Sequence, residues 1–314
     1  MPRGRGRDLP ADPDVGGFLD YLRLECGLAD NTIVSYRRDL TCLTDYLDGR
    51  PLAEAGREDL LGFIDRQNRK GTPATVSRRI AALRMFYKFL RMENPGRKDP
   101  SSALERPSAW QRLPKVLSPA EVDALLAAPA AEFRKLKKKT RHARALYLRD
   151  RAILETLYAT GCRAGEVSRL EASGVNLDIG YVRCRGKGSK ERIVPLGAKA
   201  RAAILEYMER GRTRLLEKTG RESALLFVSR SGARLDRTNV WRLVKHYLAI
   251  AGADRNATTH TLRHSFATHM LQGGANLRAI QEMLGHASPA TTQIYTHLDR
   301  RDLVNAHRKF HPRG

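Results

Sequence analysis

The sequence has few cysteines, and they form no metal-binding or disulfide pattern. Its 314 residues include four cysteines, and no Cys-x-x-Cys pair is present. They are scattered along the chain, at Cys26, Cys42, Cys162 and Cys184. This usage argues against a disulfide-stapled secreted fold and favours reduced thiols in a cytosolic protein.

Long apolar runs are also missing. No stretch approaches the roughly 18 apolar residues that mark a membrane-spanning helix, and no lysine-rich helix has the strong apolar face that lies on a bilayer. The N-terminal MPRGRGRDLPADP is charged but lacks an apolar core, so it is not a signal peptide. We therefore expect a cytoplasmic protein with no membrane partner. Neither a P-loop nor a Rossmann glycine pattern occurs, so we expect chemistry without a nucleotide cofactor.

Acidic residues are scarce relative to basic ones. The chain has 34 Asp and Glu residues against 57 Lys and Arg residues, a formal net charge of +23. So large a charge exceeds what solubility needs and indicates a polyanionic partner, most simply nucleic acid. An anionic membrane surface is the competing partner, which the missing apolar features disfavour.

The first part of the chain predicts a helical DNA-binding domain. The length predicts about two domains, and residues 1–13 have the composition of a disordered basic tail. Residues 14–93 hold four helical patterns joined by short loops, as in a compact bundle. These patterns cover 15–25, 31–47 (capped by Asp30 or Asn31), 59–68, and the segment that begins at Thr72-Pro73. Their polar faces carry basic side chains that are candidates for phosphate contacts, or else plain solvated surface: Arg37, Arg38, Arg78, Arg79, Arg84 and Lys88.

The second part of the chain predicts a domain of mixed α and β structure. Residues 94–116 hold four prolines and no sustained period, and are interpreted as a linker before a second domain at 117–314. Ser118-Pro119-Ala120-Glu121 is a capping box for a helix that is expected to end near Pro129. The basic block at 130–145 contains RKLKKKTRHAR, which we interpret as a flexible insertion rather than a DNA-contacting arm.

Further patterns complete the expected fold, a multidomain and mainly α protein with a small antiparallel sheet. Alternating residues at 181–185 and 191–196 flank GKGSK and predict a β-hairpin. A buried strand is expected at 225–228. Helices are expected at 148–160 (ended by Gly161), 198–210 and 236–250.

The stretch from His260 to Leu298 concentrates residues that handle protons and phosphate. His260 and Arg263 are three residues apart and share a face if they lie on a helix. A second helical stripe ends at Gly285, in the position of a C-terminal glycine, and His286 follows it. Ser288-Pro289 then begins a short helix that carries Tyr295.

Four interpretations compete for this stretch. His260 and His264 have the spacing of helical zinc ligands, but no third ligand is evident and Arg263 would repel a cation. A packed core with hydrogen-bonded histidines suits His264, His269 and His297, yet does not explain the arginine. The glycines between two helices suggest a helix-turn-helix DNA reader. The fourth interpretation is a phosphoryl-transfer site with Tyr295 as the nucleophile.

Phosphoryl transfer makes definite demands on the residues. Guanidinium groups can clamp the non-bridging oxygens and stabilise the charge of the transition state. A phenol, with an ordinary pKa of about 10, needs a base such as imidazole as it attacks. The leaving alkoxide needs an acid, and a lysine on a turn can supply it. The sequence contains each part: Arg163, Lys187, His260, Arg263, His286 and Tyr295.

The motifs that carry these residues resemble those of the tyrosine recombinases, and within them the bacterial Xer group. They are LYATGCRAGEV, RGKGSKERIVPL, THTLRHSFATHML and LGHASPATTQIYTH. The resemblance covers roughly residues 14 to 314. Cys162, Ala164 and Gly165 depart from the commoner residues around Arg163, and the 130–145 block is longer and more basic than is usual.

The resemblance implies a role for each residue. Tyr295 would attack the scissile phosphate and form a 3′-phosphotyrosyl link, while Arg163 and Arg263 hold the phosphate. Lys187 would protonate the leaving 5′-oxygen, His260 would assist proton transfer, and His286 would bond the phosphate region. No ATP, metal or cofactor would be needed. Glu166 would buttress the site, unless it is an ordinary first-turn glutamate.

The resemblance also implies an assembly on double-stranded DNA at a specific recombination site. The N-terminal helices would be a SAM-like core-binding domain that forms a clamp with the catalytic domain. Protomers would form a homo- or hetero-tetramer with a related recombinase, and residues 303–310 would dock on a neighbour or else form a surface helix of their own domain. A chromosomal role in dimer resolution would add a DNA translocase and a nucleoid location. The alternatives are an integrase of a mobile element, a topoisomerase and a non-catalytic DNA-binding regulator.

Overall fold

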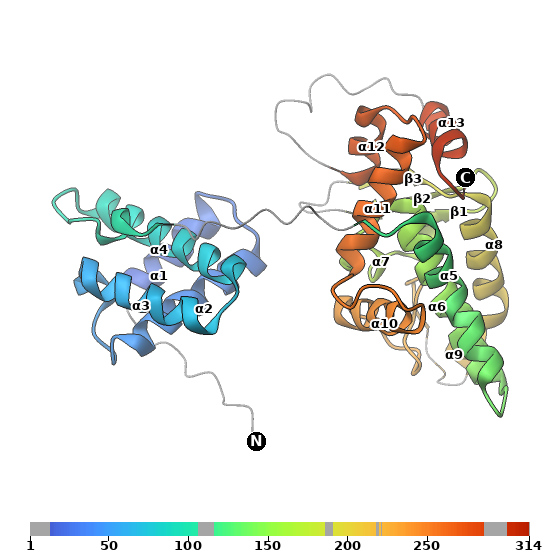
Figure 1. The fold of residues 1–314 in the computed structure, drawn as a ribbon, viewed down its shortest axis with the longest axis horizontal. Helices are drawn as coiled ribbons and strands as arrows, with labels where there is room; N and C mark the ends of the chain where they lie inside the picture. The colour runs from blue at the N-terminus through green and yellow to red at the C-terminus, as the bar shows by residue number, and fades with distance from the viewer. Residues whose placement is uncertain are drawn as a thin grey trace. The chain divides into compact units, whose positions relative to one another are not determined.

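The chain folds into two units, which are described separately. The structure, a computed structural model, describes residues 13–105, 116–185, 191–217, 220, 222–285 and 300–313, with side chains from 304 in the last segment (Figure 1). The first unit comprises residues 1–111 and the second comprises residues 112–314. Both are mainly helical, as predicted.

The first unit is a helical bundle around an aromatic core. Its four main helices are α1 (Pro13–Leu24), α2 (Asp30–Tyr46), α3 (Arg57–Lys70) and α4 (Pro73–Glu93), so all four predicted helices are present. Two 3-10 turns, Leu52–Glu54 and Pro100–Ala103, follow α2 and α4. Phe18 and Phe86 are fully buried, and their ring centroids are 5.4 Å apart in an edge-to-face contact. Helix α4 packs on the other three helices and holds the bundle together.

Local capping explains where these helices begin, with one correction. Thr72 caps α4 as predicted, because its hydroxyl accepts a hydrogen bond from the backbone N–H of Thr75 at 3.3 Å. The prediction that Asp30 or Asn31 caps α2 is wrong. Helix α2 begins at Asp30, and its N-cap is Ala29, which has no side-chain acceptor. An acidic residue in the first turn favours the helix through its dipole instead.

Part of the segment expected to be linker folds with the first unit. Leu104 is buried in the core of that unit. Its carbonyl accepts a hydrogen bond of 2.6 Å from the guanidinium of Arg84. Asp99 caps the 3-10 turn at Pro100–Ala103 through the backbone N–H of Ser101. The described residues up to Leu104 are therefore anchored to the bundle.

The second unit is built around the long helix α6 (Arg141–Thr160). Helix α6 packs against α5 (Pro119–Lys135), α8 (Ala198–Glu206) and α11 (Thr259–Gln272), and Figure 1 shows it among these helices. A π-helix at Tyr207–Arg212 and the short helix α9 (Thr213–Glu217) continue from α8. The remaining helices are α7 (Ala164–Val167), α10 (Arg237–Ile250), α12 (Leu277–Leu284) and α13 (Arg300–Phe310).

The predicted hairpin is present within a small antiparallel sheet. Strands β1 (Val175–Asn176), β2 (Tyr181–Arg185) and β3 (Glu191–Pro195) lie in that order. The register pairs Val182 with Val194 and Arg185 with Glu191. Because strand side chains alternate between faces, Val182, Cys184 and Val194 point into the core. The predicted strand at 225–228 is wrong, because these residues make only isolated bridges at Leu225 and Val228.

The helix that was expected to end near Pro129 runs on to Lys135, so that prediction is wrong. Proline in a helix interior costs about 3 kcal/mol because it removes a hydrogen bond and introduces a clash. Tertiary contacts offset this cost, because Pro129 is buried. Beyond it, the rings of Phe133 and Tyr147 stack at 4.9 Å and join α5 to α6. The capping box at Ser118 and Glu121 begins α5 as predicted.

The C-terminal helix α13 packs on its own domain through two buried histidines. His307 donates from Nε2 to the carbonyl of Ala159 at 2.8 Å. The ring of His311 stacks on that of His307 at 4.5 Å. Arg313 pairs with Glu155 of α6 at 2.5 Å. In the single chain, the described side chains from 304 to 310 therefore belong to a helix that packs on its own domain.

These histidines predict that stability falls in mild acid. Burial lowers the pKa of His307 to about 4 and that of His311 to about 2, although hydrogen bonds to backbone carbonyls oppose the shift. An unfolded histidine has a pKa of about 6.5, so below this pH the unfolded chain binds protons that the folded chain refuses. The contribution of the two neutral histidines to the free energy of unfolding is therefore full above about pH 6.5 and is lost as the pH falls towards 4. The ring of Tyr158 contacts that of His311, and the charges of Arg313 and His269 lower the pKa of His311 further.

The variant His307→Gln isolates one of these groups. Its amide can still donate to the carbonyl of Ala159 but does not titrate. We expect the loss of unfolding free energy between pH 8 and pH 5, measured by urea denaturation, to be smaller in the variant than in the parent protein. An equal loss in both proteins would show that His307 does not cause the pH dependence.

Candidate active site

The end of helix α6 brings Arg163 close to the end of α12. Gly161 ends α6 in the left-handed conformation, with φ of 59°. A Cβ atom on Gly161 would lie 2.5 Å from the ring of Phe266 and 2.8 Å from the side chain of Leu284. Glycine is therefore required for both its φ angle and its lack of a side chain. Arg163 follows two residues later as the N-cap of α7, with 46% of its side chain exposed.

Arg263 is buried on α11 and joins the two turns that carry predicted site residues. Its Nη1 donates to the carbonyl of Gly161 at 2.7 Å, and its Nη2 donates to the carbonyl of Leu284 at 2.7 Å. Burial, followed by the charge of Arg163, lowers the pKa of Arg263 to about 10. The guanidinium therefore stays protonated at neutral pH. Arg263 therefore bonds the chain two residues before Arg163.

Glu166 connects Arg163 to a third arginine that sequence analysis missed. Its carboxylate accepts hydrogen bonds from the backbone N–H of Arg163 at 2.8 Å and from Nη1 of Arg163 at 3.1 Å. Arg192 on β3 binds the same carboxylate in a bidentate pair, at 2.9 and 2.8 Å. Burial opposes ionisation, but the bonds from Arg192 and Arg163 lower the pKa of Glu166 to about 2. Glu166 is thus a buried anion that caps the first turn of α7 and also binds two arginines.

Arg192 ties the hairpin to the other two turns. Its Nε donates to the carbonyl of Met283 at 2.8 Å, near the end of α12. Gly285 follows with φ of 66°, and a Cβ atom there would lie 3.1 Å from Cδ of Arg192. The sequence held one signal for this residue. Strand alternation puts Arg192 on the same face as the buried Val194, and an inward-facing arginine requires an acidic partner.

A pair of buried thiols adds a second contact between the hairpin and the turn of Arg163. The Sγ atoms of Cys162 and Cys184 are 3.0 Å apart, and Cys184 lies opposite Arg192 across the β-ladder. Both cysteines are free and buried. The departure of Cys162 from the commoner residue therefore affects packing behind the turn that presents Arg163.

The remaining predicted site residues fall into two groups. His260 lies exposed in the first turn of α11, which Thr258 caps, and is one turn from Arg263. Lys187, His286 and Tyr295 lie outside the described residues. Lys187 belongs to the segment 186–190 that connects the paired residues Arg185 and Glu191.

The histidines that were assigned to packing also differ from one another. His269 is buried, and its Nδ1 lies 2.9 Å from the hydroxyl of Tyr158, which fits a structural role. His264 is exposed. Within the described part of the chain, no group of three His, Cys, Asp or Glu side chains is placed to hold a metal.

The cluster as a whole carries excess positive charge. Arg163, Arg192 and Arg263 surround the single carboxylate of Glu166. Arg192 and Arg263 are mostly buried, whereas the guanidinium of Arg163 is half exposed. Such an arrangement can bind a phosphate group at the surface and stabilise negative charge that develops on it.

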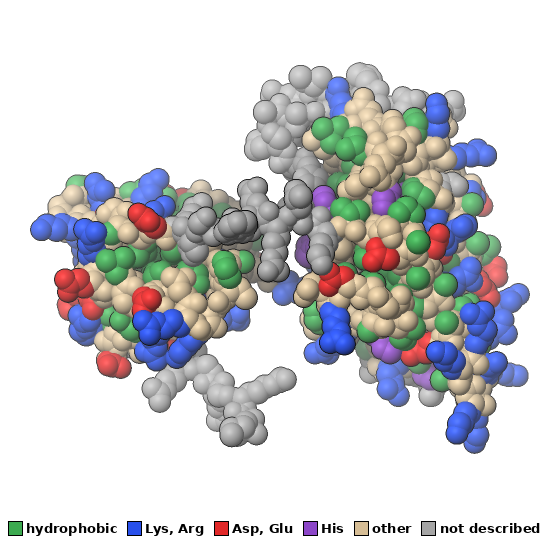
Figure 2. All heavy atoms as spheres, viewed as in Figure 1, with side chains coloured by type: hydrophobic (Ala, Val, Ile, Leu, Met, Phe, Trp, Pro, Cys, Tyr) green, Lys and Arg blue, Asp and Glu red, His purple; other side chains and the backbone are tan. Residues whose placement is uncertain are grey.

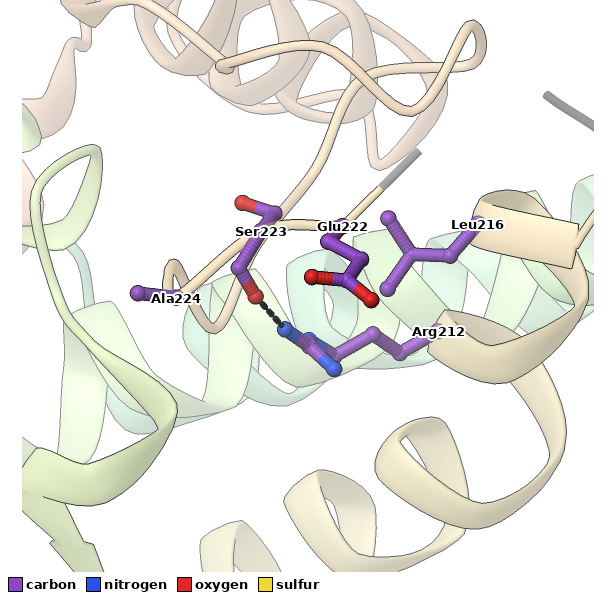
Figure 3. Close-up of a pocket in the computed structure, with 5 residues that line it drawn as sticks. All are labelled: Arg212, Leu216, Glu222, Ser223 and Ala224. Atoms are coloured by element: carbon purple, nitrogen blue, oxygen red, sulfur yellow. Dashed lines mark hydrogen bonds between the residues drawn. The ribbon is translucent and has the colours of Figure 1, made fainter. Parts of the chain in front are cut away.

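A pocket in the second unit lies on other elements. This depression of about 550 Å³ is lined by the π-helix, α9 and the segment after it (Figure 3). Arg212, the cation in its wall, donates to the carbonyls of Ser223 and Leu225. None of the predicted site residues that the structure describes lines this pocket.

The basic residues predicted to contact DNA in the first unit fall into two groups, those whose side chains bond to other described residues of the unit and those whose side chains do not. Arg78 and Arg79 both bind Asp39, whose side chain is 1% exposed, and so join α4 to α2. Arg84 binds the carbonyl of Leu104. The other three are exposed and make no ion pair with the described residues: Arg37, Arg38 and Lys88.

Comparisons with known proteins show the family to which the chain belongs. Residues 115–301 match the model of the phage integrase family, and residues 15–94 match the phage integrase N-terminal SAM-like domain. The proteins named tyrosine recombinase XerD from Oceanobacillus iheyensis and Pseudomonas putida are 43% and 42% identical to this chain. Each alignment spans 305 residues, which are 96% of this chain and 98% of the relative.

Solved structures share the fold at lower identity. The XerH site-specific recombinase in its post-cleavage complex with palindromic difH substrate superposes with a TM-score of 0.69 and 22% identity, covering 96% of this chain and 97% of that one. A lambda integrase in a tetramer bound to a Holliday junction gives a TM-score of 0.64 and 17% identity, covering 88% and 77%.

The family match and the full-length relatives show that the chain is a DNA-cleaving and rejoining enzyme. The chain belongs to the phage integrase family of tyrosine recombinases and within it is of the Xer type. The predicted resemblance is thereby confirmed. None of the helices that the structure describes is both long and apolar enough to cross a lipid bilayer.

Proposed function

We propose that this enzyme performs site-specific strand exchange on double-stranded DNA with the residue roles that follow. The Tyr295 oxygen attacks the scissile phosphorus, and a 3′-phosphotyrosyl bond forms as the bond to the 5′-oxygen breaks. Lys187 gives the leaving oxygen its proton, and His260 assists removal of the phenol proton. Arg163 and Arg263 hold the non-bridging oxygens, and His286 bonds the phosphate region. Attack by a 5′-hydroxyl reverses these steps, so rejoining needs no ATP or metal.

The observation that carries this proposal is the convergence of three sequence-distant segments. Arg263 bonds the carbonyls beside Arg163 and before Gly285, and Arg192 bonds Glu166 and Met283. These bonds join the turn before Arg163, the end of α12 and strand β3. In the sequence, each of these segments adjoins a predicted catalytic residue. A rigid arrangement of donors is what electrostatic stabilisation of a transition state requires.

The biological role that we propose is the resolution of chromosome dimers. Support comes from the full-length similarity to relatives that bear the name XerD. The working unit would be a homo- or hetero-tetramer on DNA with a related recombinase, assisted by a DNA translocase, in the cytoplasm at the nucleoid. Exposed Arg37, Arg38 and Lys88 would contact the backbone of the duplex. Integration or resolution of a mobile element is the alternative role.

Covalent trapping tests the proposed chemistry. A duplex nicked close to the cleavage position loses its 5′-hydroxyl fragment after attack, so the covalent complex accumulates. We expect a protein–DNA band that survives denaturation, and sequencing of DNA trapped in cells should reveal one recurrent site. DNA that binds without a covalent bond would instead indicate a regulator, and trapping at any sequence by a monomer that relaxes supercoils would indicate a topoisomerase.

A further inference from the structure

The hairpin of α5 and α6 ends in a cluster of exposed basic side chains, which we name the basic tip. Its members are Arg134, Lys135, Lys137, Lys138, Lys139, Arg141 and Arg144. Only Arg144 has an acidic partner among the described residues, Glu206 at 4.0 Å. Glu206 is shared with Arg151, and Glu132, two residues before Arg134, pairs with His246. The fold therefore leaves most of this charge uncompensated by the described residues.

The basic tip is held by regular structure on both sides. Helix α5 extends to Lys135, and Thr140 caps α6 by accepting from the backbone N–H of Ala143 at 3.0 Å. The stacked rings of Phe133 and Tyr147 lie just behind it. Figure 1 shows the α5–α6 hairpin projecting from the second unit, and Figure 2 shows Lys and Arg side chains gathered at its end. The expected flexible insertion is thus a short turn between two ordered helices.

The basic tip lies far from the arginine cluster of the active site. Leu117 lies just before α5, and its N–H donates to the hydroxyl of Ser265 on α11. Gly161 lies just after α6, and its carbonyl accepts from Arg263. Both helices therefore begin or end beside the site and run away from it. At about 1.5 Å per residue, their 17 and 20 residues span about 25 and 30 Å. The basic tip cannot contact the phosphate that is being cleaved.

The residue types favour a repeating phosphate backbone as the ligand. Three consecutive lysines, 137 to 139, are point charges without the fixed fork of arginine, which suits phosphates without reading sequence. Like charges this close repel one another in the free protein, and a duplex relieves that repulsion by exchanging its condensed counterions for lysines. A mere solvated turn would gain nothing from such charge density.

We propose that the basic tip binds the backbone of duplex DNA at a position separate from the cleaved phosphate. This inference rests on the proposed DNA-recombining function. At about 3.4 Å per base pair, a separation of about 25–30 Å equals roughly seven to nine base pairs along a straight duplex. The bound segment is either the flank of the same duplex or a second duplex brought into the assembly, and the two sources share the same phosphate chemistry.

Neutralising the turn tests the proposal without disturbing the helices. The variant Lys137→Gln, Lys138→Gln, Lys139→Gln is compared with a charge-matched control, Lys199→Gln, Arg210→Gln, Arg230→Gln, whose side chains are exposed elsewhere on the unit. Binding to mixed-sequence duplexes is measured over a range of salt concentrations. One duplex is a hairpin stem of about six base pairs, roughly 20 Å at about 3.4 Å per base pair and therefore shorter than the separation, and the other is several helical turns long.

For the long duplex, the binding constant is plotted against salt concentration on logarithmic axes. We expect the magnitude of the slope to fall by up to about 0.9 for each phosphate that the lysines no longer neutralise. The short duplex and the control variant should show no change in slope. If the basic tip binds a second duplex, the salt dependence of binding to one duplex stays the same in the variant. In that case the protein is first bound to a duplex that is fixed to beads, and the variant then captures less of a second, labelled duplex than the parent protein does. Unchanged slope and unchanged capture, or an equal decrease in the control, would overturn the proposal. A decrease on the short duplex would overturn the separation from the cleaved phosphate.

Failure of this proposal can be distinguished from failure of the proposed function. Covalent trapping on the nicked duplex depends on the catalytic residues and not on the turn at 137–139. We therefore expect the triple glutamine variant to form the covalent complex at DNA concentrations that saturate binding. A parent protein that forms no covalent complex would refute the recombinase chemistry and leave the salt measurement to be judged by itself.

Discussion

Tyr295→Phe is expected to bind duplex DNA as the parent protein does and to form no covalent protein–DNA complex. The substitution removes only the phenolic oxygen, which the proposed mechanism uses to attack phosphorus. The positive charge that attracts phosphate is unchanged, so affinity and its dependence on salt should persist. The measurement is a denaturing gel of protein incubated with the nicked duplex, together with anisotropy of a labelled duplex.

A matched control separates loss of the nucleophile from a general effect of losing a hydroxyl. Tyr181 begins β2 in the same domain and is half buried. Tyr181→Phe should therefore retain the covalent band. If Tyr295→Phe kept the band at the parent level, the nucleophile would be another residue and the assignment of Tyr295 would be rejected.

Arg192→Met is expected to destabilise the second unit by about 3–5 kcal/mol, because it leaves a buried carboxylate without its bidentate partner. The side chains of Glu166 and Arg192 are only 3% and 13% exposed, so water cannot replace the missing bonds. The half-exposed guanidinium of Arg163 remains as the other cation on the carboxylate. Arg192→Met should also slow covalent complex formation, since the turns that present Arg163 and Gly285 lose their common anchor.

A double-mutant cycle shows whether the charge pair causes this effect. Glu166→Gln removes the buried anion, so adding it to Arg192→Met should restore part of the unfolding free energy. Urea denaturation of the single variants and the double variant gives the coupling energy. Additive effects would mean that Arg192 acts through packing or through the carbonyl of Met283 alone. Arg192→Lys keeps the positive charge but loses the two-pronged guanidinium. Compared with Arg192→Met, we expect it to recover more of the unfolding free energy than of the rate of covalent complex formation.

Much of the fold was predictable because it depends on local signals. The apolar period located the four helices of the first unit, Thr72 and Ser118 marked two helix starts, and the glycines at 161 and 285 marked two helix ends. Alternation around GKGSK located the hairpin and its paired strands. The errors arose where distant contacts override local preference, as at Pro129, whose burial lets α5 continue, and at 225–228, where the apolar residues are buried without a ladder.

The sequence by itself determined the chemistry of this protein, because the chemistry depends on which functional groups are present and on their motifs. Arg163, His260, Arg263 and Tyr295 predicted phosphoryl transfer, and the excess of basic residues predicted a nucleic-acid partner. Only the tertiary structure decided which charges serve the fold and which remain available. It assigned Arg78 and Arg79 to Asp39, joined Arg192 to Glu166, and left the turn at 137–139 without an acidic partner among the described residues. The physical reason is that the partner of a charge is set by burial and by contacts between residues far apart in the chain, which no local pattern records.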